Sequence, residues 1–144
     1  MAIEYFEKLP DMTAYKKLFD TTGWNKWYRA SAGDLQEALK QSWYALCAYD
    51  SGRLAGFGRV VSDGVLYAMI YDLIVAPSFQ GRGIGTEILN RIISRCNNAG
   101  IRELQLFSAP GLSGFYLKRG FMVRPADAPG MRLKKSDKLK IGSF

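Results

Sequence analysis

The sequence predicts a mixed α/β (α+β) fold, in which a central, mostly antiparallel sheet carries helices on both faces. Apolar segments over residues 43–49, 53–62 and 65–75 are separated by the short turns Asp50-Ser51-Gly52 and Asp63-Gly64. This pattern is typical of an antiparallel meander. An apolar helical period follows over residues 84–99, and another apolar run covers residues 101–107. Because a helix joins the last two strands, they are expected to be parallel.

The chain of 144 residues is long enough for one hydrophobic core, so residues 1–144 are interpreted as a single domain. Its apolar runs are all much shorter than the roughly 20 residues of a membrane span. The first residues lack the basic and apolar regions of a signal peptide. Cys47 and Cys96 are far apart and are expected to be reduced thiols. These features favour a cytoplasmic protein with no membrane partner.

The N-terminal third is expected to contain one short strand and two helices. Residues 3–6 read as the strand and residues 10–19 as the first helix, which ends at the Thr21-Thr22-Gly23 sequence. An aromatic cluster in a turn follows at residues 24–28. Asp34 is predicted to cap a second helix, whose apolar face consists of Leu35, Ala38 and Leu39.

The C-terminal third is expected to end in further strands. A short helix is predicted over residues 112–119, and Gly120 closes it. Apolar residues at 121–123 then predict one strand, and residues 131–133 predict a final one. The last part of the chain holds much of the basic charge and is interpreted as a solvated end; its basic residues are Arg132, Lys134, Lys135, Lys138 and Lys140.

The turn between the apolar residues 71–75 and the long helix has the composition of an anion-binding site. The helix N-terminus offers unpaired amides and the positive end of the dipole, and glycines let a phosphate approach the backbone. A P-loop would need a lysine after Gly85, and a dinucleotide fingerprint would need a glycine where Thr86 stands. The sequence therefore predicts a cradle for a phosphate or pyrophosphate of another kind of ligand.

Composition excludes several chemistries. The chain has no histidine and only two cysteines, which excludes Ser–His and Cys–His nucleophiles and argues against a metal site. The net charge of +7 fits nucleic acid, a membrane surface or an acidic small ligand. Motifs typical of nucleic-acid binding are missing from the sequence, so a nucleic-acid partner is not favoured.

Two motifs resemble the GNAT acetyltransferase superfamily. Gln80-Gly81-Arg82-Gly83-Ile84-Gly85 is similar to its acetyl-CoA signature, and the segment from Gly114 to Phe121 is similar to its Tyr-x-x-x-Gly-Phe motif. The two occur in the family's order and the element order agrees over nearly the whole chain. The resemblance implies the GNAT fold, with a splayed parallel strand pair, and an N-acetyltransferase domain that uses acetyl-CoA as cosubstrate.

The resemblance also implies which residues hold acetyl-CoA. The cradle amides from Gln80 to Thr86 would bind the pyrophosphate, and Arg82 would add a charge there. A bulge in the preceding strand would free amides for the pantetheine arm, and one at Ile74 or Val75 could bind the thioester oxyanion. Ser108 replaces an asparagine that is frequent in the family. The full expected set is Leu73, Ile74, Val75, Gln80, Gly81, Arg82, Gly83, Ile84, Gly85, Thr86, Ser108 and Tyr116.

For catalysis, Tyr116 matches the family tyrosine that protonates the departing thiolate, although a purely structural core tyrosine is the alternative. The position of the usual general base is Tyr71, and the nearest carboxylate is Asp72. Strand alternation would turn Asp72 to the opposite face unless the bulge shifts the phase, and a structural pairing of Asp72 is an equal alternative. A relayed water, or an amine that arrives neutral, would need no base.

The acceptor is expected to be the primary amine of a small molecule. Trp24, Trp27 and Tyr28 could line an aromatic pocket, and a loose resemblance to aralkylamine (serotonin-type) acetyltransferases points to an arylalkylamine. A peptide N-terminus, an aminoglycoside and a polyamine stay open, although the basic charge disfavours a polyamine. The alternative function is a non-catalytic CoA-binding or nucleic-acid-associated module. The chain is expected to be a monomer or a homodimer.

Overall fold

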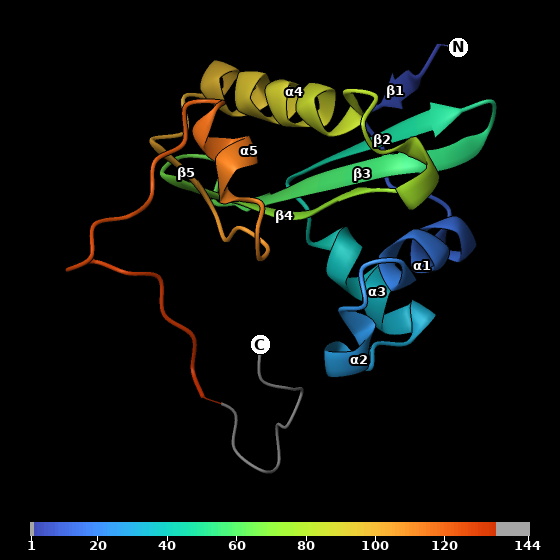
Figure 1. Cartoon of the computed structure of the whole chain (residues 1–144), viewed down its shortest axis with the longest axis horizontal. Helices are drawn as coiled ribbons and strands as arrows, with labels where there is room; N and C mark the ends of the chain where they lie inside the picture. Colours follow the sequence, from blue (N-terminus) through green and yellow to red (C-terminus); the bar gives the residue numbers. More distant parts are fainter. Residues whose placement is uncertain (1, 135–144) are drawn as a thin grey trace.

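The computed structural model describes residues 2–134 and confirms a mixed α+β fold around a five-stranded sheet (Figure 1). Its elements follow one another as β1 (Glu4–Phe6), α1 (Met12–Asp20), α2 (Asn25–Tyr28), α3 (Ala32–Lys40), β2 (Tyr44–Asp50), β3 (Arg53–Ser62), β4 (Tyr67–Val75), the 3-10 turn η1 (Pro77–Phe79), α4 (Ile84–Asn98), β5 (Glu103–Leu106) and α5 (Ser113–Leu117).

The strands lie in the order β1-β2-β3-β4-β5, so neighbours in the sequence are also neighbours in the sheet. The first four strands are antiparallel, as the hairpin turns predict. β5 is parallel to β4 but pairs with only part of it, from Tyr67 opposite Glu103 to Ile70 opposite Leu106. The second half of β4 therefore leaves its β5-side edge open, which is the splayed strand pair that the resemblance implies.

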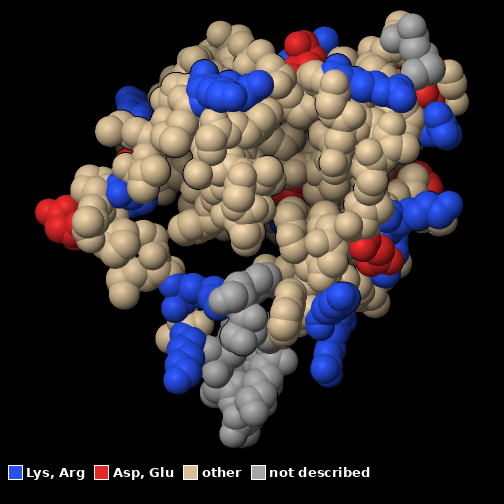
Figure 2. All heavy atoms as spheres, in the orientation of Figure 1, with Lys and Arg blue, Asp and Glu red and all other residues tan. Residues whose placement is uncertain are grey.

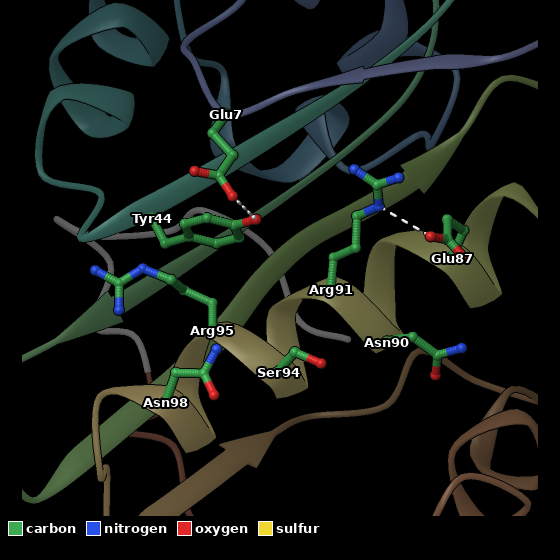
Figure 3. Close-up of a pocket in the computed structure, with 8 residues that line it drawn as sticks. All are labelled: Glu7, Tyr44, Glu87, Asn90, Arg91, Ser94, Arg95 and Asn98. Atoms are coloured by element: carbon green, nitrogen blue, oxygen red, sulfur yellow. Dashed lines mark hydrogen bonds and ion pairs between the residues drawn. The ribbon is translucent and has the colours of Figure 1, made fainter.

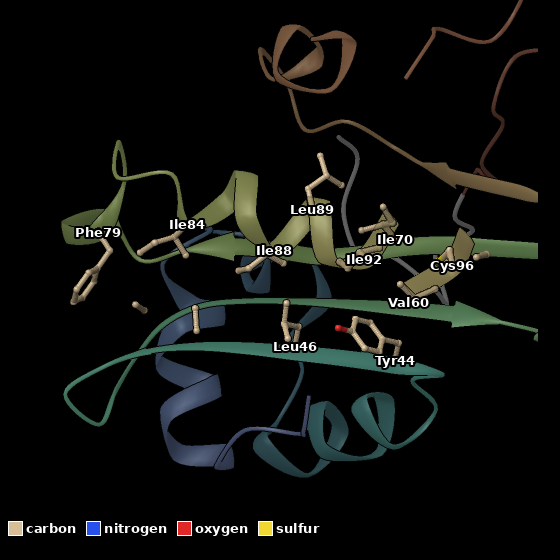
Figure 4. Close-up of a cluster of buried hydrophobic side chains, with 13 residues drawn as sticks. Tyr44, Leu46, Val60, Ile70, Phe79, Ile84, Ile88, Leu89, Ile92 and Cys96 are labelled. Carbon is tan, nitrogen blue, oxygen red and sulfur yellow. The ribbon is translucent and has the colours of Figure 1, made fainter. Parts of the chain in front are cut away.

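Helix α4 packs on one face of the sheet and buries the main core (Figure 4). Its apolar stripe is the predicted one, with Ile84, Ile88 and Ile92 buried. The helix lies very close to β3, because a Cβ atom at Gly58 would be only 2.8 Å from Ile88 Cγ2. Gly56 is similarly tight, at 3.0 Å from Ile84 Cγ2. Because Gly56 and Gly58 have no side chain, α4 can lie this close to β3.

Helices α1 and α3 cover the other face and form a second core. Tyr15 of α1 is fully buried there, with its ring 4.9 Å from that of Phe57. Its hydroxyl has no hydrogen-bond partner within the described structure. Burial first, and then the nearby charge of Asp72, raise the pKa of Tyr15 above its ordinary value. The Tyr15 hydroxyl is therefore neutral, and it is buried close to Asp72.

The N-terminal region differs from the prediction in two details. The second helix begins earlier, because Ser31 and not Asp34 is the N-cap. Asp34 is the third residue of the helix and accepts from the Ser31 amide, while the Ser31 hydroxyl accepts from the Asp34 amide, so the two form a capping box. Residues 24–28, the aromatic cluster that was expected in a turn, include the short helix α2.

The two strands predicted after α5 are wrong. Residues 121–134 contain no helix or strand and add no strand to the described sheet (Figure 1). Of the basic residues in the predicted solvated end, Lys135, Lys138 and Lys140 lie outside the described residues. On the face seen in Figure 2, Lys and Arg side chains are spread over the outline and do not form one continuous patch.

Candidate active site

The cradle forms where the chain passes from η1 into α4. Gly81 and Gly83 have φ angles of 80° and 79°, a left-handed conformation that favours glycine. Gly83 is the N-cap of α4, and a Cβ at either glycine would meet open space. Among the described residues, no backbone carbonyl accepts from the amides of residues 81–86. A run of free amides at a helix N-terminus with open space beside it fits a pyrophosphate.

A buried aromatic ring anchors the cradle to the core. Phe79 in η1 is 5% exposed, and the guanidinium groups of Arg53 and Arg82 lie 5.0 and 5.3 Å from its ring centre. Arg82 is itself exposed, so its charge is available beside the cradle amides. The sequence predicted this role for Arg82, but it did not indicate that Phe79 would hold the arginine in place.

The end of β4 presents backbone groups toward the open edge. The Ala76 amide donates to Ala55 of β3 at 2.8 Å, and residue directions alternate along a strand. The amide and carbonyl of Val75 therefore point away from β3, while those of Ile74 point toward it. The Gln80 side-chain amide donates to the Val75 carbonyl at 3.1 Å, which confirms that direction. Val75 thus offers a free amide next to the cradle, and Gln80 ties the two together.

A β-bulge in β4 lies where the strand leaves β5. Opposite β3, the register passes from Tyr71 at Arg59 to Ile74 at Phe57, so Asp72 and Leu73 share one partner residue. Asp72 has a φ angle of 55°, a left-handed conformation that aspartate tolerates better than most residues. The bulge was implied by the family resemblance, although its centre is one or two residues earlier than the expected free amides.

The bulge changes the direction of Asp72 and pairs it with β3. Its carboxylate accepts from Arg59 Nε at 2.6 Å, with the two side chains 17% and 13% exposed. The same guanidinium lies 5.6 Å from the Tyr71 ring and donates to the Ala38 carbonyl of α3 at 3.2 Å. Tyr71 and Asp72 are therefore both in contact with Arg59 on the α1–α3 side, and simple strand alternation does not hold here.

Arg59→Ala is expected to lower the free energy of unfolding by about 2–3 kcal/mol, because it leaves the largely buried Asp72 carboxylate without its charged partner. Lys40→Ala is the matched control: its pair with Glu37 is 53% and 71% exposed, so its loss should cost less than about 0.5 kcal/mol. Urea denaturation measures both variants. Equal stability of the two would show that the Asp72–Arg59 pair does not hold the bulge.

Tyr116 lies on α5 and is half-buried between two aromatic rings. Its ring centre is 5.1 Å from that of Phe115 and 5.8 Å from that of Phe121. Burial raises the pKa of Tyr116 above its ordinary value, so the phenol stays protonated at neutral pH. Phe115 in turn lies beside the cradle, where its Cζ would be 3.7 Å from a Cβ at Gly85. The helix that carries Tyr116 therefore packs next to the N-terminus of α4.

Arg119 holds this contact in place, a role that the sequence analysis did not predict. Its guanidinium donates to the Thr86 hydroxyl at 2.6 Å and to the Phe115 carbonyl at 2.7 Å. It also stacks on the Phe115 ring at 4.0 Å. Thr86 is the third residue of α4, so Arg119 joins the predicted proton donor's helix directly to the cradle. Its Nε is buried and has no partner in the described chain.

The remaining predicted site residues are exposed or half-buried. Ser108 is exposed, and its hydroxyl donates to the neighbouring Ala109 carbonyl at 2.9 Å. Trp24 is half-buried against Phe19, with ring centres 5.9 Å apart. Trp27 and Tyr28 of α2 are 39% and 49% exposed. α2 lies with α1 and α3 (Figure 1). Asp72 is on the same side of the sheet, because its partner Arg59 donates to the Ala38 carbonyl of α3.

An open hollow of about 340 Å³ lies elsewhere, along the outer surface of α4 (Figure 3). It is bordered by α4 from Glu87 to Asn98 and by Glu7 and Tyr44, with no cradle residue in its wall. The Tyr44 hydroxyl donates to Glu7 at 3.2 Å, and burial followed by the Glu7 charge raises the pKa of Tyr44 to about 12. None of the residues that line this hollow belongs to the cradle or to the end of β4, so it is not the predicted site.

Comparison with known proteins identifies the family. The model of the acetyltransferase (GNAT) domain matches residues 13–129, so this chain belongs to the GNAT acetyltransferases and is an acyltransferase. It is 32% identical over 133 residues to an uncharacterized N-acetyltransferase of Porphyra purpurea, covering 88% of this chain and 75% of that protein. It is also 32% identical over 130 residues to the chloroplastic serotonin N-acetyltransferase 2 of Oryza sativa subsp. japonica, covering 88% of this chain and 64% of that protein.

Solved structures agree on the fold. A GNAT-family acetyltransferase of Streptococcus pneumoniae superimposes with a TM-score of 0.80 at 25% identity, covering 94% of this chain and all of that one. A GNAT acetyltransferase of Brucella melitensis, solved in complex with acetyl-CoA, gives a TM-score of 0.63 at 19% identity, with 93% and 94% covered. Between residues 2 and 134, no helix has the length and apolarity needed to cross a membrane.

Proposed function

We propose that this acetyltransferase moves the acetyl group of acetyl-CoA to the primary amine of a small molecule by direct attack. The observation that carries the proposal is the cradle, in which the amides of residues 81–86 are free at the N-terminus of α4. A pyrophosphate there would receive several backbone N–H donors, the helix dipole and the charge of Arg82. Acetyl-CoA supplies the activated thioester, and the chain supplies binding and orientation.

The open edge of β4 would hold the reactive end of acetyl-CoA. The pantetheine arm contains amide groups that can pair with a free strand edge, as an added strand does. In this proposal the Val75 amide donates to the thioester oxygen as negative charge develops on it. Leu73 and Ile74 belong to the same part of β4. The Ile74 amide faces β3, so Ile74 would not donate to acetyl-CoA and would only keep this part of the strand in place.

Proton transfer completes the reaction. The amine nitrogen bonds to the acetyl carbon, the carbon–sulfur bond breaks, and Tyr116 gives its phenolic proton to the departing sulfur. The amine loses one proton to water, since Asp72 is engaged by Arg59 at 2.6 Å and serves to hold the bulge. Tyr71 occupies the position of the usual base but is a phenol, so we assign it a part in shaping the acceptor side.

The acceptor would reach the thioester from the α1–α3 side of the sheet. Tyr71, Trp27 and Tyr28 are exposed on elements of that side, which favours a ligand with an aromatic ring. The rice relative is named for serotonin, an arylalkylamine. We therefore propose arylalkylamines as the acceptor class, with acetyl as the acyl group.

The test is a thiol-release assay with acetyl-CoA and a panel of amines: tryptamine, phenethylamine, spermidine and a lysine-containing peptide. Release is expected with the two arylalkylamines at rates clearly above the amine-free background. Release with spermidine or the peptide alone would overturn the acceptor class but keep the acetyl transfer. Calorimetric binding of acetyl-CoA without release for any amine would overturn amine acetylation.

A pair of glycine variants tests the cradle in the same assay. Gly83 and Gly100 flank the two ends of α4, with φ angles of 79° and 73° and open space around both. Valine is strained at either position by about 1–3 kcal/mol, but only Gly83→Val disturbs the proposed pyrophosphate site. The KM for acetyl-CoA is expected to rise about tenfold or more in Gly83→Val alone. Equal KM values in both variants would place the cosubstrate elsewhere.

A further inference from the structure

A half-buried cation lies without a counter-ion at the start of α4. Arg119 comes just after α5, and no carboxylate among residues 2–134 forms an ion pair with its guanidinium. The guanidinium lies against Thr86, the third residue of α4, where the helix dipole is already positive. Positive charge gathered in a partly desolvated place is unfavourable unless an anion compensates it. An anion bound at this end of α4 would therefore stabilise the arrangement.

The Thr86 hydroxyl lies between this cation and the cradle. A hydroxyl group can both accept hydrogen bonds and donate one. Thr86 Oγ1 accepts from Arg119 Nη2 at 2.6 Å, and the Thr86 O–H has no acceptor among residues 2–134. Its hydrogen is therefore available to a ligand in the cradle. Because the bond that Thr86 accepts comes from a charged group, it makes the O–H a stronger donor.

The same guanidinium holds the helix that carries the proposed proton donor. Arg119 Nη1 donates to the Phe115 carbonyl at 2.7 Å, and the guanidinium stacks on the Phe115 ring at 4.0 Å. Tyr116 is the next residue of α5, so a movement of Phe115 would displace its phenol. α5 spans only Ser113–Leu117, and a helix this short keeps its place through tertiary contacts.

We infer that Arg119 is a positioning residue that couples the pyrophosphate in the cradle to the position of Tyr116. The inference rests on the proposed function, because it takes acetyl-CoA as the ligand of the cradle. A phosphate oxygen accepts from the Thr86 O–H, Thr86 accepts from Arg119, and Arg119 holds Phe115. A bound pyrophosphate thus favours the arrangement of Arg119 that also orients α5, so the proton donor is in place when acetyl-CoA is bound.

Calorimetric titration with CoA tests the link to the pyrophosphate without turnover. Arg119→Met keeps an unbranched side chain beside Phe115 but removes the charge. Its Kd for CoA is expected to rise about tenfold, the loss of one hydrogen bond that involves a charged group. Thr86→Val should give a similar rise, and the double variant should be no worse than the weaker-binding single variant, since both changes break one contact.

Lys118→Met is the control for these titrations. Lys118 is the neighbouring cation, it is exposed, and its ammonium group has no hydrogen-bond or ion-pair partner among residues 2–134. Its Kd for CoA should equal that of the parent chain. Circular dichroism checks the fold of each variant. If Arg119→Met does not fold, Thr86→Val carries the test, because it breaks the same contact and leaves α5 unaltered.

Turnover in two backgrounds tests the link to Tyr116. In the parent chain, Arg119→Met is expected to lower the turnover number about tenfold or more, because the phenol is misplaced. In the Tyr116→Phe background the same change should lower it less than about twofold, because no phenolic proton is left to misplace. A merely structural Arg119 would lower turnover by the same factor in both backgrounds, and that result would overturn the inference.

The titrations also separate the inference from the proposed function. An unchanged Kd for CoA in Arg119→Met and Thr86→Val would overturn the inference, whether or not the parent chain releases thiol. Fully additive effects of the two changes on Kd would overturn it too, because the residues would then act separately. A parent chain that releases no thiol with any amine, but shows the expected Kd changes, would overturn acetyl transfer and support the link between Arg119 and the pyrophosphate.

Discussion

Tyr116→Phe is expected to lower the turnover number of acetyl transfer by about 10²- to 10⁴-fold, which is the typical contribution of a general acid to the rate. The KM for acetyl-CoA should stay within about twofold, because the phenyl ring keeps its contacts with Phe115 and Phe121. Burial raises the pKa of Tyr116, so its proton is present throughout pH 6–9. The ratio between parent and variant should therefore be flat over that range. Steady-state thiol release measures all three quantities.

Tyr67→Phe is the matched control for this experiment. Tyr67 is 61% exposed at the start of β4, at the far end of the strand from Val75. Its loss of one hydroxyl should leave the turnover number unchanged. If Tyr116→Phe retains more than half of the parent turnover, Tyr116 is a packing residue and water protonates the leaving thiolate.

Gly58→Val is expected to destabilise the fold strongly and, through it, to disturb the site. Its Cβ alone would lie 2.8 Å from Ile88 Cγ2 and 3.1 Å from Ile92 Cδ1. Overpacking of this kind typically costs about 1–3 kcal/mol, and two further methyl groups against a helix place this case at the upper end. Because α4 also supplies the cradle amides, a displaced helix should weaken acetyl-CoA binding together with stability.

Thermal denaturation and calorimetric titration of acetyl-CoA measure these two effects. Gly33→Val is the control, since a Cβ at Gly33 has an ordinary 3.6 Å contact with the Ser31 hydroxyl and faces no helix. Gly58→Val combined with Ile88→Ala should be more stable than the sum of the two single changes predicts, because the smaller residue makes room for the valine. Strict additivity would show that Gly58 and Ile88 do not compete for the same space.

Sequence reasoning was most successful where a local pattern has a local cause. Three glycines at alternate positions before a 3.6-residue apolar period can produce little else than a turn and a helix N-terminus, and the structure has both. The hairpin at Ser51 and Gly52, with positive φ angles of 49° and 82°, follows from turn chemistry in the same way. The acetyltransferase family followed from two motifs of this kind, and the family match over residues 13–129 confirms it.

The contacts that join distant segments could not be predicted in this way. Arg59 and Asp72 meet because a bulge of two residues against one rotates Asp72 out of the strand's alternation, and no local signal distinguishes that aspartate from a solvent-facing one. Arg119 reaches Thr86 across 33 positions of sequence, so neither residue reveals the contact alone. The strands predicted at residues 121–123 and 131–133 have β-prone sequences but no partner in the described chain, and a strand requires a partner.

The sequence by itself thus determined the sheet meander and the glycine turn that leads into α4, since each depends on residues that are neighbours along the chain. Two motifs that resemble the GNAT family indicated the class of reaction. Only the tertiary structure decided that Asp72 is held by Arg59, that Gly56 and Gly58 bring α4 onto β3, and that Val75 has a free amide beside Gln80. These features arise from strand register and side-chain volume across the core. Both quantities are fixed by packing between segments, which the order of residues does not display.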